Sequence, residues 1–138
     1  MEYIQKEYLI YFYEDTSIPR HWLVDFFCKK PKFKHVGAWG YNPYSDQWFG
    51  IEYTHRGIKH QFYSKEQMET ILAYFKKNKF AVLKVPVKHN WKLIWIKEHS
   101  CVSFIMRLIG YENWFIWTPY QLFCALKKKG IKSFYSNN

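Results

Sequence analysis

The spacing of apolar residues along the chain predicts short strands separated by turns. Residues 8–13 form a continuous apolar and aromatic run, which is typical of a buried strand. Segments rich in turn-forming residues, such as 40–47 and the pair Arg56-Gly57, separate further runs of this kind. Strands are predicted at residues 8–13, 33–39, 48–54, 58–63, 80–85 and 91–96.

Other segments carry apolar residues at helical spacing, framed by start and stop signals. A serine or threonine before the first apolar residue favours a helix start, and glycine or proline favours a stop. One helix is predicted to begin at Ser17 and Pro19 and to end at Pro31, and a second begins at Ser64, with Gln67 completing a capping box. A third contains Cys101 at its start and ends at Gly110, and a fourth begins at Thr118 and Pro119 and ends at Gly130. The chain is therefore predicted to be α+β, with a central, mostly antiparallel sheet of five to six strands packed with about four helices.

The length of 138 residues indicates a single domain, 1–138, large enough to bury a core. We expect this core within residues 8–130 and a loosely held tail at 131–138. Aromatic residues make up 22% of the chain, so part of this bulk is expected on a surface or in a groove.

The formal net charge of +10 comes almost wholly from lysine. Lysines cluster at residues 29–32, 76–77 and 127–129, each at a predicted helix end. There they complement the negative end of the helix dipole as solvated caps. The alternative is attraction to an anionic partner, such as nucleic acid or a polyanionic envelope.

The three cysteines, Cys28, Cys101 and Cys124, are widely spaced, and none belongs to a C-x-x-C pair. This pattern indicates neither a disulfide framework nor a zinc ribbon, and it predicts a reducing compartment or a particle assembled in one. We expect neither a metal nor a cofactor. Residues 1–6 lack the apolar stretch of a signal peptide, and no run of eighteen apolar residues predicts a membrane span.

Cys101 and His35 are the candidates for chemistry. Cys101 opens a predicted helix, where unpaired backbone N–H groups and the helix dipole favour a thiolate. His35 lies on a predicted strand and is a base for that thiol if the fold brings the two together. The backbone N–H of Cys101 would then be one donor to a developing oxyanion.

A hairpin closing symmetrically about Pro43 and Tyr44 would put His35 directly opposite Glu52, which would orient the ring. The same register predicts Trp39 opposite Trp48 and Gly37 opposite Gly50, all on one face of the sheet. The two glycines would leave a hollow for the helix of Cys101. A slip of one residue would move Glu52 to the other face.

Each of these residues also has an ordinary structural interpretation. A cysteine such as Cys101 is often a small buried hydrophobe. His35 can be a core histidine with its hydrogen bonds satisfied, and Glu52 can point into water.

Four short segments carry a resemblance to a known family: KHVG at 34–37, FGIE at 49–52, CVSF at 101–104 with RLIG at 107–110, and TPYQL at 118–122. The chain resembles the circularly permuted branch of the papain-like fold, related to NlpC-type cell-wall peptidases, in its small phage-encoded form. The resemblance covers residues 33–126, over half of the chain. Ser100 stands where the family pattern has Asn or Asp, and the first 30 residues have no counterpart.

The resemblance implies a cysteine hydrolase that cleaves an amide bond, with peptide or peptidoglycan as substrate. It assigns Cys101 as nucleophile, His35 as base and Glu52 as the polar third member. Trp39, Trp48 and Tyr53 are predicted to line a substrate groove. It also implies a place in the host cytoplasm or in a virion particle.

Two other classes of function stay open, along with an acyltransferase that uses the same thiol. One is a phage virion or interaction protein that keeps the fold without turnover, with virion partners. The other is a nucleic-acid-binding domain, because basic and aromatic residues interleave over residues 76–95.

Overall fold

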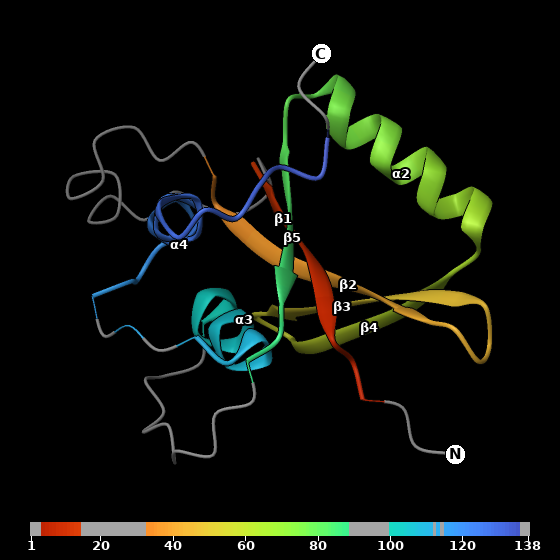
Figure 1. The fold of residues 1–138 in the computed structure, drawn as a ribbon, viewed down its shortest axis with the longest axis horizontal. Helices are drawn as coiled ribbons and strands as arrows, with labels where there is room; N and C mark the ends of the chain where they lie inside the picture. Colours follow the sequence, from red (N-terminus) through yellow and green to blue (C-terminus); the bar gives the residue numbers. More distant parts are fainter. Residues whose placement is uncertain (1–3, 15–32, 89–99, 112, 114, 136–138) are drawn as a thin grey trace.

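The computed structural model describes residues 4–14, 33–88, 100–111, 113 and 115–135 (Figure 1). Its strands are β1 (Glu7–Tyr13), β2 (His35–Asn42), β3 (Gln47–Thr54), β4 (Gly57–Tyr63) and β5 (Ala81–Pro86), and its helices are α2 (Lys65–Lys77), α3 (Cys101–Ile109) and α4 (Pro119–Lys128). The helix predicted from Ser17 and the strand predicted at 91–96 lie outside the described residues. Among the described helices, none is both long and apolar enough to cross a membrane.

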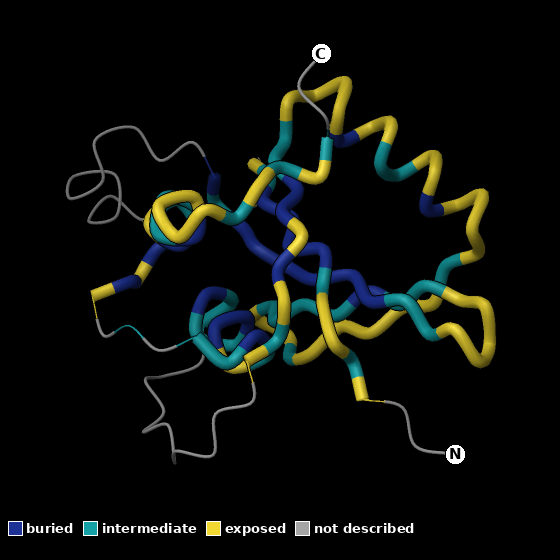
Figure 2. Tube along the Cα trace, viewed as in Figure 1, coloured by how far each residue is buried: buried dark blue, intermediate teal, exposed yellow. Residues whose placement is uncertain are grey.

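The strands form one sheet in the order β4-β3-β2-β1-β5, and every neighbouring pair is antiparallel. This confirms the predicted α+β class and the antiparallel sheet. The central strand β2 is the most deeply buried, whereas β4 at the edge is largely exposed (Figure 2).

Helices cover both faces of the sheet, with α2 on one side and α3 and α4 on the other (Figure 1). Successive side chains of a strand point to opposite faces of the sheet, so the protein has one hydrophobic core on each face. Odd residues of β1, such as Leu9 and Tyr11, pack with Met68 and Phe75 of α2. Even residues of β1 pack instead with α3 and α4, in a cluster that includes Ile10, Phe12, Val102, Ile105 and Leu122.

All three described helices begin with a capping box. The predicted pair of Ser64 and Gln67 is confirmed at α2. At α3 the cap is Ser100, whose hydroxyl accepts from the N–H of Ser103 at 3.1 Å. The first turn of α3 holds no acidic residue, so no negative side chain within it opposes an anion there.

Gly110 ends α3, as predicted, for two reasons. Its φ of 71° lies in the left-handed region that glycine adopts without strain. In addition, a Cβ at this position would lie 1.7 Å from the carbonyl oxygen of Lys88. The lysines at 76–77 and 127–128 lie in the last turns of α2 and α4, as predicted, and residues 29–32 are not described.

The predicted tail at 131–138 is held more tightly than expected as far as residue 135. The Phe134 N–H donates to the Val82 carbonyl at 2.8 Å, and Ser133 forms a bridge with Leu83. The Tyr135 hydroxyl donates to the Leu72 carbonyl at 3.0 Å. The described part of the tail therefore contacts β5 and α2.

The register predicted for the β2–β3 hairpin is also wrong, by two residues. Trp39 pairs with Gly50, and Tyr41 pairs with Trp48. The hairpin closes between Asn42 and Gln47, so its loop is centred one position later than expected. The side chain of Asn42 accepts from the Tyr44 N–H at 2.9 Å, and Asp46 has a φ of 52°. These local features set the turn, and the turn sets the register.

Candidate catalytic site

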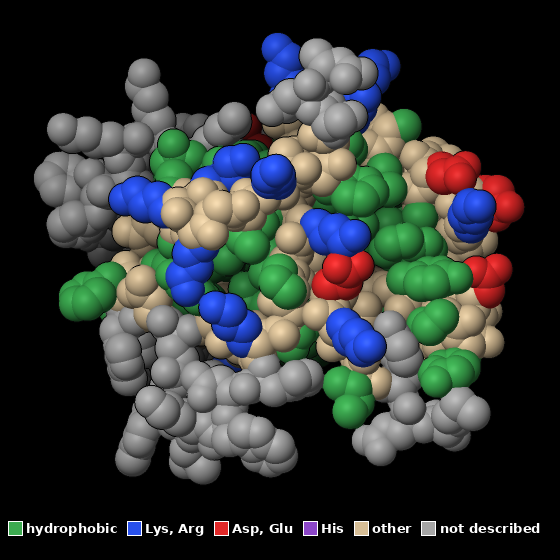
Figure 3. All heavy atoms as spheres, viewed as in Figure 1, with side chains coloured by type: hydrophobic (Ala, Val, Ile, Leu, Met, Phe, Trp, Pro, Cys, Tyr) green, Lys and Arg blue, Asp and Glu red, His purple; other side chains and the backbone are tan. Residues whose placement is uncertain are grey.

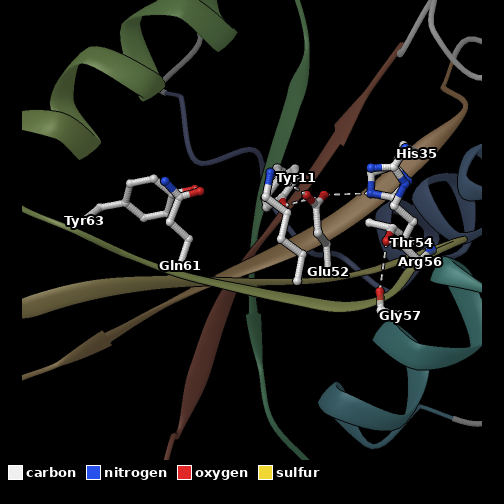
Figure 4. Close-up of polar contacts among 9 residues, drawn as sticks. Tyr11, His35, Glu52, Thr54, Arg56, Gly57, Gln61 and Tyr63 are labelled. Carbon is white, nitrogen blue, oxygen red and sulfur yellow. Dashed lines mark hydrogen bonds and ion pairs between the residues drawn. The ribbon is translucent and has the colours of Figure 1, made fainter.

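His35 and Glu52 form a direct contact in spite of the shifted register (Figure 4). The distance between His35 Nε2 and Glu52 Oε2 is 2.7 Å. Because the shift is an even number of residues, Glu52 stays on the same face of the sheet as His35. The two residues therefore meet diagonally across β2 and β3, rather than directly opposite each other.

Tyr11 is a further member of this group, and the sequence analysis did not identify it. Its hydroxyl donates to Glu52 Oε2 at 3.1 Å, and its ring stacks on Trp39 with centroids 4.1 Å apart. Tyr11 pairs with Gly37 across β1 and β2. Gly37 is the feature of the sequence that could have pointed to such a neighbour, because a glycine inside a strand often permits a close approach by a side chain of the next strand.

The electrostatics of the group favour an ion pair. Burial alone would lower the pKa of His35, but hydrogen bonds with Cys101 and Glu52 outweigh it and raise the pKa to about 9. Burial alone would raise the pKa of Glu52, but the hydrogen bond with His35 brings it below its ordinary value. At neutral pH the pair is therefore an imidazolium and a carboxylate.

The hydroxyl of Tyr11 stays protonated and remains a donor to that carboxylate. Burial, followed by the negative charge of Glu52, raises the pKa of Tyr11 well above its usual value. The Lys59 ammonium lies 3.5 Å from the other oxygen, Glu52 Oε1, and its side chain is largely exposed.

Cys101 is the first residue of α3, is half-buried and forms no disulfide. Hydrogen bonding between its side chain and His35 is one of the causes that raise the pKa of the ring. Glu52 Oε2 contacts Nε2 of the same ring at 2.7 Å. The structure thus brings Cys101, His35 and Glu52 together, with the ring in the middle.

Cys101 lies at a different place on the sheet from the one predicted. The expected hollow at Gly37 and Gly50 is absent from this described part of the sheet, because aromatic rings from Tyr11, Trp39 and Tyr63 occupy the space above these two glycines. Cys101 instead packs against the core on the α3 side. It meets the ring at the end of the sheet, since His35 is the first residue of β2.

The three predicted groove residues do not share one face. Trp39 is 3% exposed and belongs to the core under α2. Trp48 is half-buried beside Tyr41, on the same side of the sheet. Tyr53 points to the opposite face, where its ring lies 6.2 Å from that of Phe104, one turn after Cys101. Of the three, Tyr53 is the one beside the first turns of α3.

Within the described residues, no group of three histidine, cysteine or acidic side chains could hold a metal ion. In comparisons with known proteins, no family model, no curated protein and no solved structure matches the chain.

Proposed function

We propose that this protein is a cysteine hydrolase that cleaves an amide bond through a thioester intermediate. The observation that carries the proposal is the position of His35, which interacts with the thiol of Cys101 and with the carboxylate of Glu52. A thiol, a base and a group that orients the base are the three parts that such a nucleophile needs.

The roles follow from the protonation states. At neutral pH the His35 imidazolium holds the proton that the Cys101 thiol gives up, and the thiolate sulfur attacks the carbonyl carbon of the substrate. As the C–N bond breaks, the imidazolium returns the proton to the leaving amine. Water, deprotonated by the ring, then hydrolyses the thioester and releases a carboxylic acid and the free thiol. Glu52 holds the ring in place and supports its charge.

The position of Cys101 in the helix also supports the proposal. The first N–H groups of a helix have no partner within it and point out of its N-terminal end. The N–H of Cys101 is one of these, so it is a donor for the negative oxygen of the tetrahedral intermediate.

The substrate class rests on the family resemblance, which favours peptides of peptidoglycan. The positive charge of the chain is compatible with an anionic envelope as the site of action. On the face drawn in Figure 3, Lys and Arg side chains gather over α4 and the adjacent part of the sheet. Attraction of this kind weakens as salt screens it.

The test compares Cys101→Ala with Cys124→Ala, its matched control on α4. With peptidoglycan peptides as substrate, we expect Cys101→Ala to abolish the release of new amino groups and Cys124→Ala to retain it. In the unmodified protein, iodoacetamide at neutral pH should label Cys101 faster than Cys124, as read by peptide mass spectrometry. Full activity of Cys101→Ala, or labelling of Cys101 no faster than that of Cys124, would refute the mechanism.

An interaction protein without turnover is the second candidate, and the edge strand β4 favours it. Its side chains Ile58 and Phe62 are each 61% exposed, which is unusual for large apolar residues on an edge strand. This candidate expects a stable multimer or partner complex by light scattering, together with ordinary reactivity of Cys101.

A further inference from the structure

A cavity of about 640 Å³ lies between α2 and the sheet. Strands β1, β2, β3 and β4 and helix α2 all contribute to it, and most of its lining residues are aromatic. The lining includes the rings of Tyr13, Tyr74, Phe75 and Phe80 and the carboxylates of Glu14 and Glu52.

The charge of this lining is opposite to that of the protein as a whole. The chain carries +10, yet the charged residues that line the cavity are both acidic, Glu14 and Glu52. Lys34 pairs with Glu14, and both His35 and Lys59 pair with Glu52. None of these three cations lines the cavity. The charged groups that face the cavity are therefore carboxylates, each already paired with a cation outside the lining.

Glu52 retains capacity to accept a hydrogen bond from a ligand. Its Oε2 accepts from Tyr11 and from His35 (Figure 4), whereas its Oε1 has only the 3.5 Å contact with Lys59 among the contacts described. Because the pKa of Glu52 is lowered, mainly by the bond with His35 against the effect of burial, the carboxylate is ionised at neutral pH. A donor with a positive charge is the partner that such an oxygen favours.

The aromatic walls favour the same charge. The face of an aromatic ring carries negative electrostatic potential and attracts an ammonium group placed over it. The rings of Tyr13, Tyr74, Phe75 and Phe80 lie close together, with Tyr13 and Phe75 centroids 6.0 Å apart and Tyr74 and Phe80 centroids 6.2 Å apart. They also offer apolar area to the body of a ligand.

We infer that this cavity binds a small organic ammonium ion, with its apolar body against the rings and its N–H donors toward Glu52 Oε1. The inference does not depend on the proposed hydrolase, because neither Cys101 nor His35 lines the cavity. The site lies on the carboxylate side of the catalytic group and shares Glu52 with it.

The experiment uses the full chain and three probes of similar shape in isothermal titration calorimetry. These are 2-phenylethylamine, the neutral 2-phenylethanol and the anionic 3-phenylpropionate. At neutral pH we expect the amine to bind at least about tenfold more tightly than the alcohol. The propionate should show no measurable binding.

Variants of Tyr74 test the location. Tyr74 lines the cavity from α2 and is 58% exposed, so its replacement should leave the fold intact. We expect Tyr74→Lys to weaken binding of the amine by about tenfold or more, because it adds a positive charge and removes a ring. The matched control, Tyr74→Phe, should bind the amine as the unmodified protein does.

Cys101→Ala should also retain the affinity for the amine, so a failure of the hydrolase proposal would leave this result unaffected. The inference is overturned if the amine binds no more tightly than the alcohol. It is equally overturned if Tyr74→Lys leaves the affinity for the amine unchanged, since the ligand would then sit elsewhere.

Discussion

The ring of Tyr11 lies so close to Gly37 that a Cβ on residue 37 would be 2.2 Å from the Tyr11 hydroxyl oxygen. This approach places the hydroxyl on Glu52 Oε2, which also binds His35. A glycine on β2 therefore determines where a tyrosine of β1 can support a carboxylate of β3.

Replacing Gly37 with alanine should displace the Tyr11 ring and lower the free energy of unfolding. Forcing an extra carbon into a packed region typically destabilises a protein by about 1–3 kcal/mol. Urea denaturation measures the change. Gly130→Ala is the comparison, because a Cβ there has nothing within 4 Å and only the strain of its φ of 86° remains. A Gly37→Ala variant as stable as the unmodified protein would contradict the close approach.

Tyr11→Phe should keep the ring in place and remove one donor from Glu52. A hydrogen bond to a charged group contributes about 1.5–3 kcal/mol, so the free energy of unfolding should fall by an amount of this order. The pKa of Glu52 should rise, because the bond with Tyr11 is among the causes that lower it. Carboxyl NMR shifts report that pKa.

The control for this variant is Tyr63→Phe, which removes an exposed hydrogen bond to Gln61 of 3.1 Å. We expect that change to alter the free energy of unfolding by less than about 0.5 kcal/mol. Equal effects of the two variants would argue against a special role for the Tyr11 hydroxyl.

The raised pKa of His35 predicts how stability depends on pH. The folded-state pKa of about 9 lies above the ordinary value of 6.5. The charged ring therefore stabilises the fold fully below pH 6.5, and this contribution is lost as the pH rises through about 9. The free energy of unfolding should decrease over that interval, and the decrease should be smaller in His35→Gln. Parallel pH profiles for the two proteins would exclude His35 as the source.

Cys101→Ala should lower the pKa of His35, because the interaction with the thiol is one cause that raises it. Titration of the imidazole by NMR measures this without any substrate. Cys124→Ala, in the neighbouring helix, should leave the His35 titration unchanged. If Cys101→Ala also left it unchanged, the thiol and the ring would not be in contact.

Local features of the sequence were sufficient to predict most of the elements. The capping pair of Ser64 and Gln67, the stop at Gly110 and the Thr118-Pro119 start depend on residues within one or two turns of each other, and all three occur in the structure. Apolar runs between turn-forming residues, together with helical spacing, likewise predicted the described strands and the α+β class, because these signals are local to each element.

The tertiary structure decided what depends on contacts between distant segments. The hairpin register followed from the turn geometry at Asn42 and Asp46, and the shift of two residues kept Glu52 beside His35 only because strand side chains alternate with a period of two. The place of Tyr11 depends on β1 lying next to β2, and the cavity depends on α2 covering one face of the sheet. The position of Tyr11 and the cavity join residues far apart in the chain through packing, and no local spacing in the sequence specifies them.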